Sequence, residues 1–211
     1  MFDNRKDAGQ KLGKRLSGYK GSDALVLAIP RGGVEVGHYV AEHLELAFSI
    51  IVVRKLPFPY NPEAGFGAVA EDGSIYLVGS AHHHIPEQIK EQIIDEQKQE
   101  IERRIKALRG GNPLPEISDR TVILVDDGIA MGSTMNAAIM LCRNKQAGKI
   151  VVAAPVASPE MEDEIAQVAD KVVILEKPPY FRAVAEAYRN WYDVGDDEVM
   201  RIIEQSSRFA G

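Results

Sequence analysis

The sequence offers almost nothing for covalent cross-linking or for membrane insertion. Its 211 residues contain one cysteine, Cys142, so an internal disulfide is excluded, and the apolar helical pattern around this residue predicts a buried packing role. No apolar run approaches the roughly 20 residues needed to cross a bilayer. No apolar stretch follows the charged start, as a secretion signal would require. We therefore expect a cytoplasmic protein with no membrane partner.

Positive charge is also in short supply. Lysine and arginine together number 25, against 31 aspartate and glutamate residues, which gives a net charge of -6 at pH 7. Broad binding to nucleic acid requires basic surface that displaces counterions from phosphate groups, so we expect no nucleic-acid partner. A local phosphate site is still compatible with an acidic average, because oriented backbone N–H groups and a few cations suffice to form one.

Short apolar runs rich in β-branched residues alternate with segments of helical period along most of the chain. Because these runs are apolar at successive positions, both faces of the resulting sheet should be covered by helices. The pattern predicts an α/β fold: one domain, residues 1–211, with a doubly wound, mostly parallel sheet. The expected strands are residues 24–29, 48–53, 122–125, 150–154 and 171–175.

Three further segments interrupt or extend this pattern. Residues 55–79 are rich in proline, glycine and aromatic residues, and we expect a flexible loop over 56–66 followed by a hairpin that turns at Asp72 and Gly73. A helix of about twenty residues should follow Pro86. The aromatic tail, residues 178–211, becomes helical near Asp196 and would form a small cap, or hood, together with the helical stretch 3–16.

The sharpest signal lies in residues 121–134, where a buried strand ends in Asp126 and Asp127 and a glycine-containing loop leads into a helix. Unpaired N–H groups of that loop and first turn, with the hydroxyls of Ser133 and Thr134, form a compact anion site at the sheet edge where open α/β sheets bind ligands. Paired carboxylates accept hydrogen bonds from vicinal hydroxyls. The combination predicts a site for a ribose 5-phosphate.

Simpler explanations exist for each half of this signal, and two better known phosphate motifs are excluded. Asp-Asp-Gly can be turn chemistry alone, and Ser or Thr can merely cap a helix. The loop has no lysine before Ser133, so it is not a Walker loop. Gly65, Gly67 and Ala70 match the letters of a dinucleotide fingerprint, but a strand before them and a helix after them are not expected.

At these residues the chain resembles the type I phosphoribosyltransferases, and within them a branch with the string V-D-D-G-x-A-x-G; the resemblance extends over residues 25–199. It implies that Asp126 and Asp127 hold the ribose hydroxyls of phosphoribosyl diphosphate (PRPP). Many members have Thr in place of Met131 and some purine-using members an acidic residue in place of Ala130, so purine salvage is in question. The resemblance assigns the 5′-phosphate to Gly128, Ile129, Ala130, Met131, Gly132, Ser133 and Thr134.

The resemblance also implies a pyrophosphate site and a metal. The loop after the first strand resembles the family's pyrophosphate loop, which often has unusual peptide geometry, and a basic pair leaves the second strand. As catalytic residues the resemblance suggests Asp126, Asp127, Lys55 and Arg31, with Mg²⁺ held by the two aspartates through water. The pyrophosphate residues would be Pro30, Arg31, Gly32, Gly33, Arg54 and Lys55.

The reaction implied is displacement of pyrophosphate from PRPP by a nitrogen nucleophile of a small-molecule acceptor such as a nucleobase, with loop 56–66 as a lid against water. A non-catalytic sensor of PRPP or a nucleotide and a sugar-phosphate hydrolase are the alternatives, and a homodimer is left open. We interpret residues 82–84, three histidines, as a solvated turn. Arg103, Arg104 and Arg109 suit the end of a helix dipole, and the resemblance brings one of them to the ligand.

Overall fold

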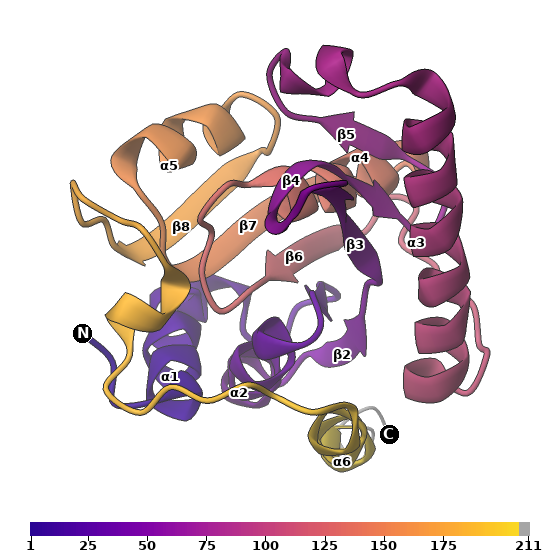
Figure 1. The fold of residues 1–211 in the computed structure, drawn as a ribbon. Coiled ribbons are helices and arrows are strands. Elements are labelled where there is room, and N and C mark those ends of the chain that lie inside the picture. Colours follow the sequence, from indigo (N-terminus) through magenta and orange to yellow (C-terminus); the bar gives the residue numbers. More distant parts are fainter. Residues whose placement is uncertain (207–211) are drawn as a thin grey trace.

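The core of the molecule is a five-stranded sheet in the order β2-β1-β6-β7-β8, seen in a computed structural model that describes residues 1–206 (Figure 1). All neighbouring strands run parallel. The α/β fold with a mostly parallel sheet that the sequence predicts is confirmed. The strands are β1 (Leu25–Ala28), β2 (Ala47–Ile50), β6 (Thr121–Val125), β7 (Lys149–Val156) and β8 (Lys171–Glu176).

Alternate residues of each central strand enter separate apolar layers, as a sheet covered on both faces requires. In β6, Val122 and Leu124 pack under α4 (Ser133–Asn144) and α5 (Pro159–Ala166). Ile123 and Val125 face the opposite layer. That layer is closed by α1 (Arg5–Arg15) and α2 (Gly32–Leu44). The sheet is therefore wound on both faces.

A second, antiparallel sheet has the order β3-β4-β5 and packs between α4 and the long helix α3 (Glu87–Arg109). Gly73, at φ 89°, lies in the tight turn between β4 and β5, where the sequence predicts it. The expected single strand 48–53 is divided, because the chain leaves the parallel sheet after Ile50 and enters the second sheet at Val53. The strands are β3 (Val53–Phe58), β4 (Asn61–Ala70) and β5 (Ile75–Leu77).

Strands β3 and β4 form a hairpin where the sequence suggests a loop over residues 56–66. We refer to residues 53–70 as the β3–β4 arm. Its prolines obscured the strand pattern, but β3 lies at the edge of its sheet, where a missing N–H is tolerated. The register shifts on both sides of Pro57 absorb the irregularity. The predicted lid segment is thus a β-arm with Pro59 and Tyr60 at its tip.

The C-terminal segment returns to the N-terminus before it ends in α6 (Asp196–Ser206), which begins where the sequence predicts (Figure 1). Phe2 donates a backbone hydrogen bond to Ala187 and accepts one from Arg189, at 2.8 and 2.9 Å. Within residues 1–206, no helix has the length and apolar character to span a bilayer. Short 3₁₀ turns complete the chain: η1 (Ser17–Tyr19), η2 (Ala81–His84) and η3 (Val184–Ala187).

Candidate active site

Two loops that the sequence singles out leave the same edge of the parallel sheet and touch. Ala28 of β1 is the register partner of Val125 in β6, so the loops after these strands start level. A Cβ on Gly32 would lie 1.8 Å from Oδ2 of Asp127, and one on Gly33 would lie 2.9 Å from Oδ1 of Asp126. Only glycine permits this approach. The Pro-Arg-Gly-Gly loop and the carboxylate pair therefore form one site.

The backbone of the first loop has the unusual geometry that the resemblance implies. The peptide bond between Pro30 and Arg31 is cis. Helix α2 begins at Gly32, directly after it. Its first N–H groups thus open at the edge where Asp126 and Asp127 lie.

Asp127 is buried and held by residues that sequence reasoning missed. Arg5 Nε donates a hydrogen bond of 2.8 Å to Asp127 Oδ2, and the side chains of the pair are 4% and 12% exposed. The hydroxyl of Tyr188 donates to the backbone oxygen of Asp127 at 2.6 Å. One signal could have pointed to Arg5, because it occupies the same stripe of α1 as buried Ala8 and Leu12.

The two carboxyl groups influence each other strongly. Burial raises the pKa of Asp126 well above its ordinary range, and the adjacent charge of Asp127 raises it further. Burial also raises the pKa of Asp127, while the Arg5 guanidinium opposes that rise. The backbone N–H of Asp127 donates to Asp126 Oδ1 at 2.8 Å. The pair is thus a fixed set of acceptors that is costly to leave charged and unoccupied.

The loop after the carboxylates delivers a helix start that can receive an anion. Gly132 has φ 69° and sits against the sulfur of Met161, so it needs to be glycine. No side chain caps α4, and within the described residues no acceptor is bonded to the backbone N–H groups of Ser133, Thr134 and Met135. These are the N–H groups that a helix leaves unpaired at its positive end. Met131 is 49% exposed at the rim of this loop.

Cations gather on the opposite wall. Arg54 is half-buried and donates to Gln97 at 3.0 Å. Burial lowers the pKa of Arg54, and so does the positive charge of Arg104 beside it. Glu100 accepts hydrogen bonds from Arg103 and Arg104, which hold the pKa of Glu100 down at about 2. Arg54 of the predicted basic pair thus joins two arginines of α3 whose role the sequence left open.

One carboxylate closes this group of cations. Asp196, at the start of α6, lies 3.2 Å from Arg103 and 3.9 Å from Arg31. Arg31 therefore reaches the same cluster from the first loop. We call Arg31, Arg54, Arg103 and Arg104 the arginine cluster.

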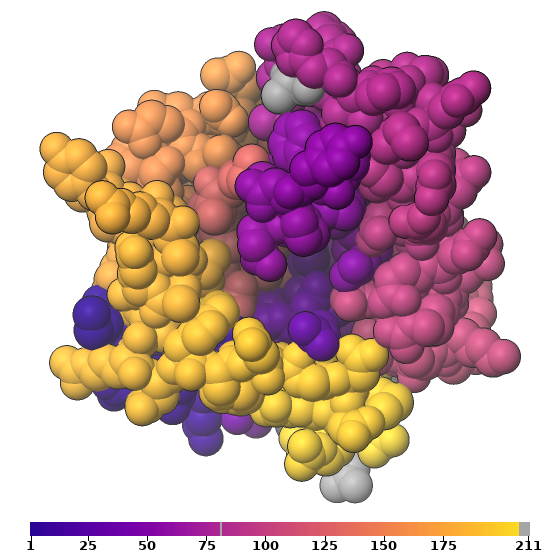
Figure 2. All heavy atoms as spheres, in the orientation of Figure 1, coloured from indigo at the N-terminus to yellow at the C-terminus, as the bar shows by residue number. Residues whose placement is uncertain are grey.

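The remaining predicted cation, Lys55, points along the β3–β4 arm, where its Nζ donates to the backbone oxygen of Glu63 at 2.7 Å. Figure 2 shows a hollow in the middle of this face, bordered by the arm, by α3 and by the C-terminal segment. A lysine on the arm can approach the hollow only if the arm bends over it.

The phosphoribosyl transferase domain model matches residues 3–187, a stretch that includes both loops and the arm. The chain belongs to the phosphoribosyl transferase family.

Relatives within the phosphoribosyl transferase family are similar to nearly the whole chain. Two Mycobacterium tuberculosis proteins, from strains CDC 1551 / Oshkosh and ATCC 25618 / H37Rv, are provisionally named phosphoribosyl transferases and are 37% identical over 210 residues. The match covers 99% of this chain and 47% of each relative, so the chain spans about half the length of these proteins. The crystal structure of the protein TT1426 from Thermus thermophilus is 34% identical, has a TM-score of 0.80, and is covered to 98% by 97% of this chain.

The phosphoribosyl transferase match ends before the segment that closes the site. Tyr188, Trp191, Tyr192 and Asp196 all lie beyond residue 187. They supply the contacts to the Asp127 backbone, to Arg5 and to the arginine cluster. The hood of this phosphoribosyl transferase is therefore built from residues that the domain model does not describe.

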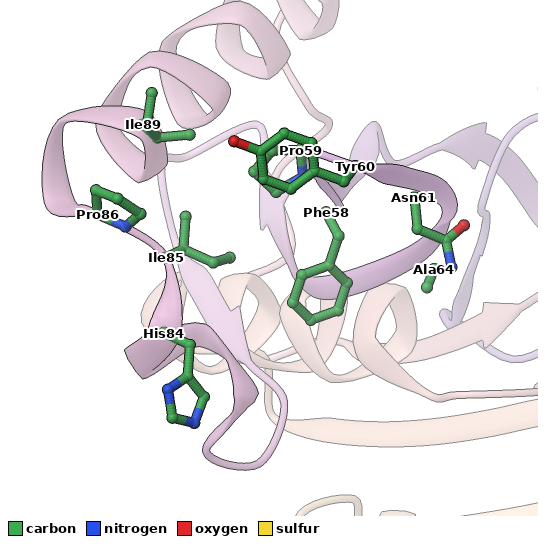
Figure 3. A pocket seen from close by; sticks show the side chains of 9 residues that line it. All are labelled: Phe58, Pro59, Tyr60, Asn61, Ala64, His84, Ile85, Pro86 and Ile89. Carbon is green, nitrogen blue, oxygen red and sulfur yellow. The ribbon is translucent and has the colours of Figure 1, made fainter.

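The histidine run and the largest apolar cavity lie elsewhere in the molecule. His83 and His84 are exposed, and the described residues include no group of three potential metal ligands. A cavity of about 460 Å³ lies between the arm tip and the start of α3, with Phe58 and Tyr60 facing Ile85 and Ile89 (Figure 3). None of the residues that line it belongs to the carboxylate pair, the phosphate loop or the arginine cluster.

Proposed function

We propose that this chain binds PRPP in the hollow and transfers its phosphoribosyl group to a nitrogen nucleophile, with release of pyrophosphate. The observation that carries the proposal is the packing of Gly32 and Gly33 against Asp127 and Asp126. It places a loop with free helix-start N–H groups beside a pair of acceptors and a second helix start. A phosphorylated sugar with a second phosphate group at its other end fits this arrangement of donors and acceptors.

Each part of PRPP has a matching group. Asp126 and Asp127 accept hydrogen bonds from the ribose hydroxyls. Residues 128–134, with the N-terminus of α4 and the hydroxyls of Ser133 and Thr134, hold the 5′-phosphate. Pro30, Gly32 and Gly33 offer backbone to the pyrophosphate, and the arginine cluster stabilises its charge as the bond from C1 to oxygen breaks and the bond from C1 to nitrogen forms.

The donor set fits Mg²⁺ only in company with the substrate. Asp126 and Asp127 supply hard carboxylate oxygens, and Mg²⁺ is usually bound by one or two carboxylates together with substrate phosphates and water. These two residues would hold the ion through water. When bound, Mg²⁺ would neutralise charge on the diphosphate oxygens.

The β3–β4 arm is the proposed lid. The positive charge that develops on the ribose has to be kept from water, and an arm beside the hollow can close over it. Closing would also carry Lys55 towards the leaving pyrophosphate. The acceptor is proposed to be a planar nitrogen base, for which the aromatic tail at Trp191 and Tyr192, both partly exposed, offers stacking surface.

Incubation of the protein with PRPP, Mg²⁺ and a panel of nitrogen bases, with pyrophosphate release as the measurement, tests the proposal. We expect release only in the presence of a suitable base. Release without a base would indicate a hydrolase. Saturable PRPP binding without release would indicate a sensor, an alternative that gains support from the contact of Asp196 with the cations Arg31 and Arg103. No binding of PRPP at all would contradict the proposal.

A further inference from the structure

We propose that Arg5 is a positioning residue: it connects the C-terminal segment 188–192 to Asp127, so that the hold on the ribose hydroxyls depends on that segment being in place. This inference rests on the proposed function, because it concerns the carboxylate to which we assign the sugar. It goes further in assigning a role at the site to a residue 122 positions away in the sequence.

Arg5 makes a different contact with each part of its guanidinium group. Nε donates to Asp127 Oδ2 at 2.8 Å, and one terminal nitrogen donates to the backbone oxygen of Tyr192 at 2.9 Å. The plane of the group lies over the indole ring of Trp191, with 4.0 Å from the central carbon to the ring centroid. Arg5 itself is 3% exposed. A guanidinium with two donors and a flat face is required for all three contacts at once.

The tail approaches Asp127 from a second direction as well. The Tyr188 hydroxyl donates to the backbone oxygen of Asp127 at 2.6 Å, and its ring lies 5.4 Å from that of Trp191. Asp127 is thus fixed at its side chain through Arg5 and at its backbone through Tyr188. Both supports come from the tail or depend on it, so a displaced tail would release the carboxylate.

An arginine that only stabilised the fold would behave differently from a positioning residue. Loss of a structural contact lowers the fraction of folded protein and affects every ligand of the site alike. Loss of a positioning contact affects the ligand that uses Asp127 and spares one that does not. Ribose 5-phosphate needs both the carboxylates and the phosphate loop, whereas inorganic phosphate needs the loop alone.

The experiment compares the binding of these two ligands by calorimetry in Arg5→Lys and Arg5→Met, each first shown to be folded by circular dichroism. We expect ribose 5-phosphate affinity to fall about ten-fold, as for one lost hydrogen bond to a charged group. Affinity for inorganic phosphate should not change. Lys6→Met is the matched control, since Lys6 is the neighbouring, exposed cation of the same helix and lies over Tyr39.

Trp191→Leu provides a test that leaves Arg5 in place. This change should weaken ribose 5-phosphate binding in the wild-type background and add little in Arg5→Lys, since both act through one connection. Unchanged ribose 5-phosphate binding in folded Arg5→Lys, or an equal loss for both ligands, would overturn the role of Arg5 alone. If the wild-type protein does not bind ribose 5-phosphate, the proposed function fails and this inference fails with it.

Discussion

Arg109, at the end of α3, donates to both carboxylate oxygens of Glu71 in the turn after β4. Both side chains are only 6% exposed. The same arginine donates to the backbone oxygen of Ile50 at 3.1 Å, and Glu71 accepts from the N–H of Val52 at 3.0 Å. This pair therefore joins α3 to the point where the chain passes from one sheet to the other, and it takes no part in the arginine cluster.

Arg109→Met should destabilise the protein by about 3–5 kcal/mol, because Glu71 would be left buried and charged without its partner. Urea unfolding followed by circular dichroism measures the effect. Lys106→Met, an exposed change one turn earlier in α3, is the control and should leave the unfolding midpoint close to that of the wild type. A small effect of Arg109→Met would show that Glu71 can be accommodated without the ion pair.

Asp126→Asn should make the protein more stable at pH 7 and weaken its binding of ribose 5-phosphate. An acid whose pKa is raised in the folded state binds its proton more tightly there than in the unfolded chain, so stability falls as the pH rises through the raised pKa. Asparagine removes this penalty and keeps an acceptor for the N–H of Asp127. The stability gain should disappear towards pH 4, where the wild-type carboxyl group is protonated; a gain that does not depend on pH would contradict this reasoning.

Asp196→Asn should raise the affinity for inorganic pyrophosphate. The Asp196 carboxylate lies on Arg31 and Arg103, where it competes with an incoming anion for the same cations. Because these pairs are partly exposed, we expect a gain of only about two- to five-fold by calorimetry. Asp197→Asn removes the next carboxylate of α6, which is exposed, and serves as the control. Equal effects of the two changes would indicate general charge and not competition at the cluster.

PRPP with Mg²⁺ should slow cleavage of the β3–β4 arm by chymotrypsin about ten-fold, if the arm spends most of its time closed. Tyr60 at the arm tip is fully exposed, and Phe58 is followed by proline, so cleavage of the arm reports on Tyr60. Tyr180, which is 89% exposed on the tail, provides an internal control in the same digest. Equal rates at Tyr60 with and without ligand, measured by mass spectrometry, would argue against a closing lid.

The sequence was most informative where local pattern and chemistry coincide. The five parallel strands, the turn at Gly73, helix α3 and the start of α6 were predicted close to their observed positions. The sequence also indicated that Asp126, Asp127 and the helix start at Ser133 lie at one sheet edge, since each follows directly from a strand end. These features depend on neighbours in the chain, which a sequence displays.

Contacts between distant segments were not predictable in the same way. Arg5 in a charged N-terminal helix looks like solvated surface until the fold brings Asp127 and Trp191 to it. The role of Arg109 depended on the position of Glu71, which the sequence could not give. The arm was hidden by its prolines, which an edge strand tolerates and an interior strand does not.

The pairing of Ala28 with Val125 has a consequence for anyone who wishes to redesign this protein. One extra residue between Ala28 and Gly32, or one fewer between Val125 and Asp127, would shift one loop by roughly 3.3 Å against the other. The glycines would then no longer face the carboxylates. Changes of acceptor preference should accordingly be sought in the hood and the arm, while the lengths of these two short connections are kept constant.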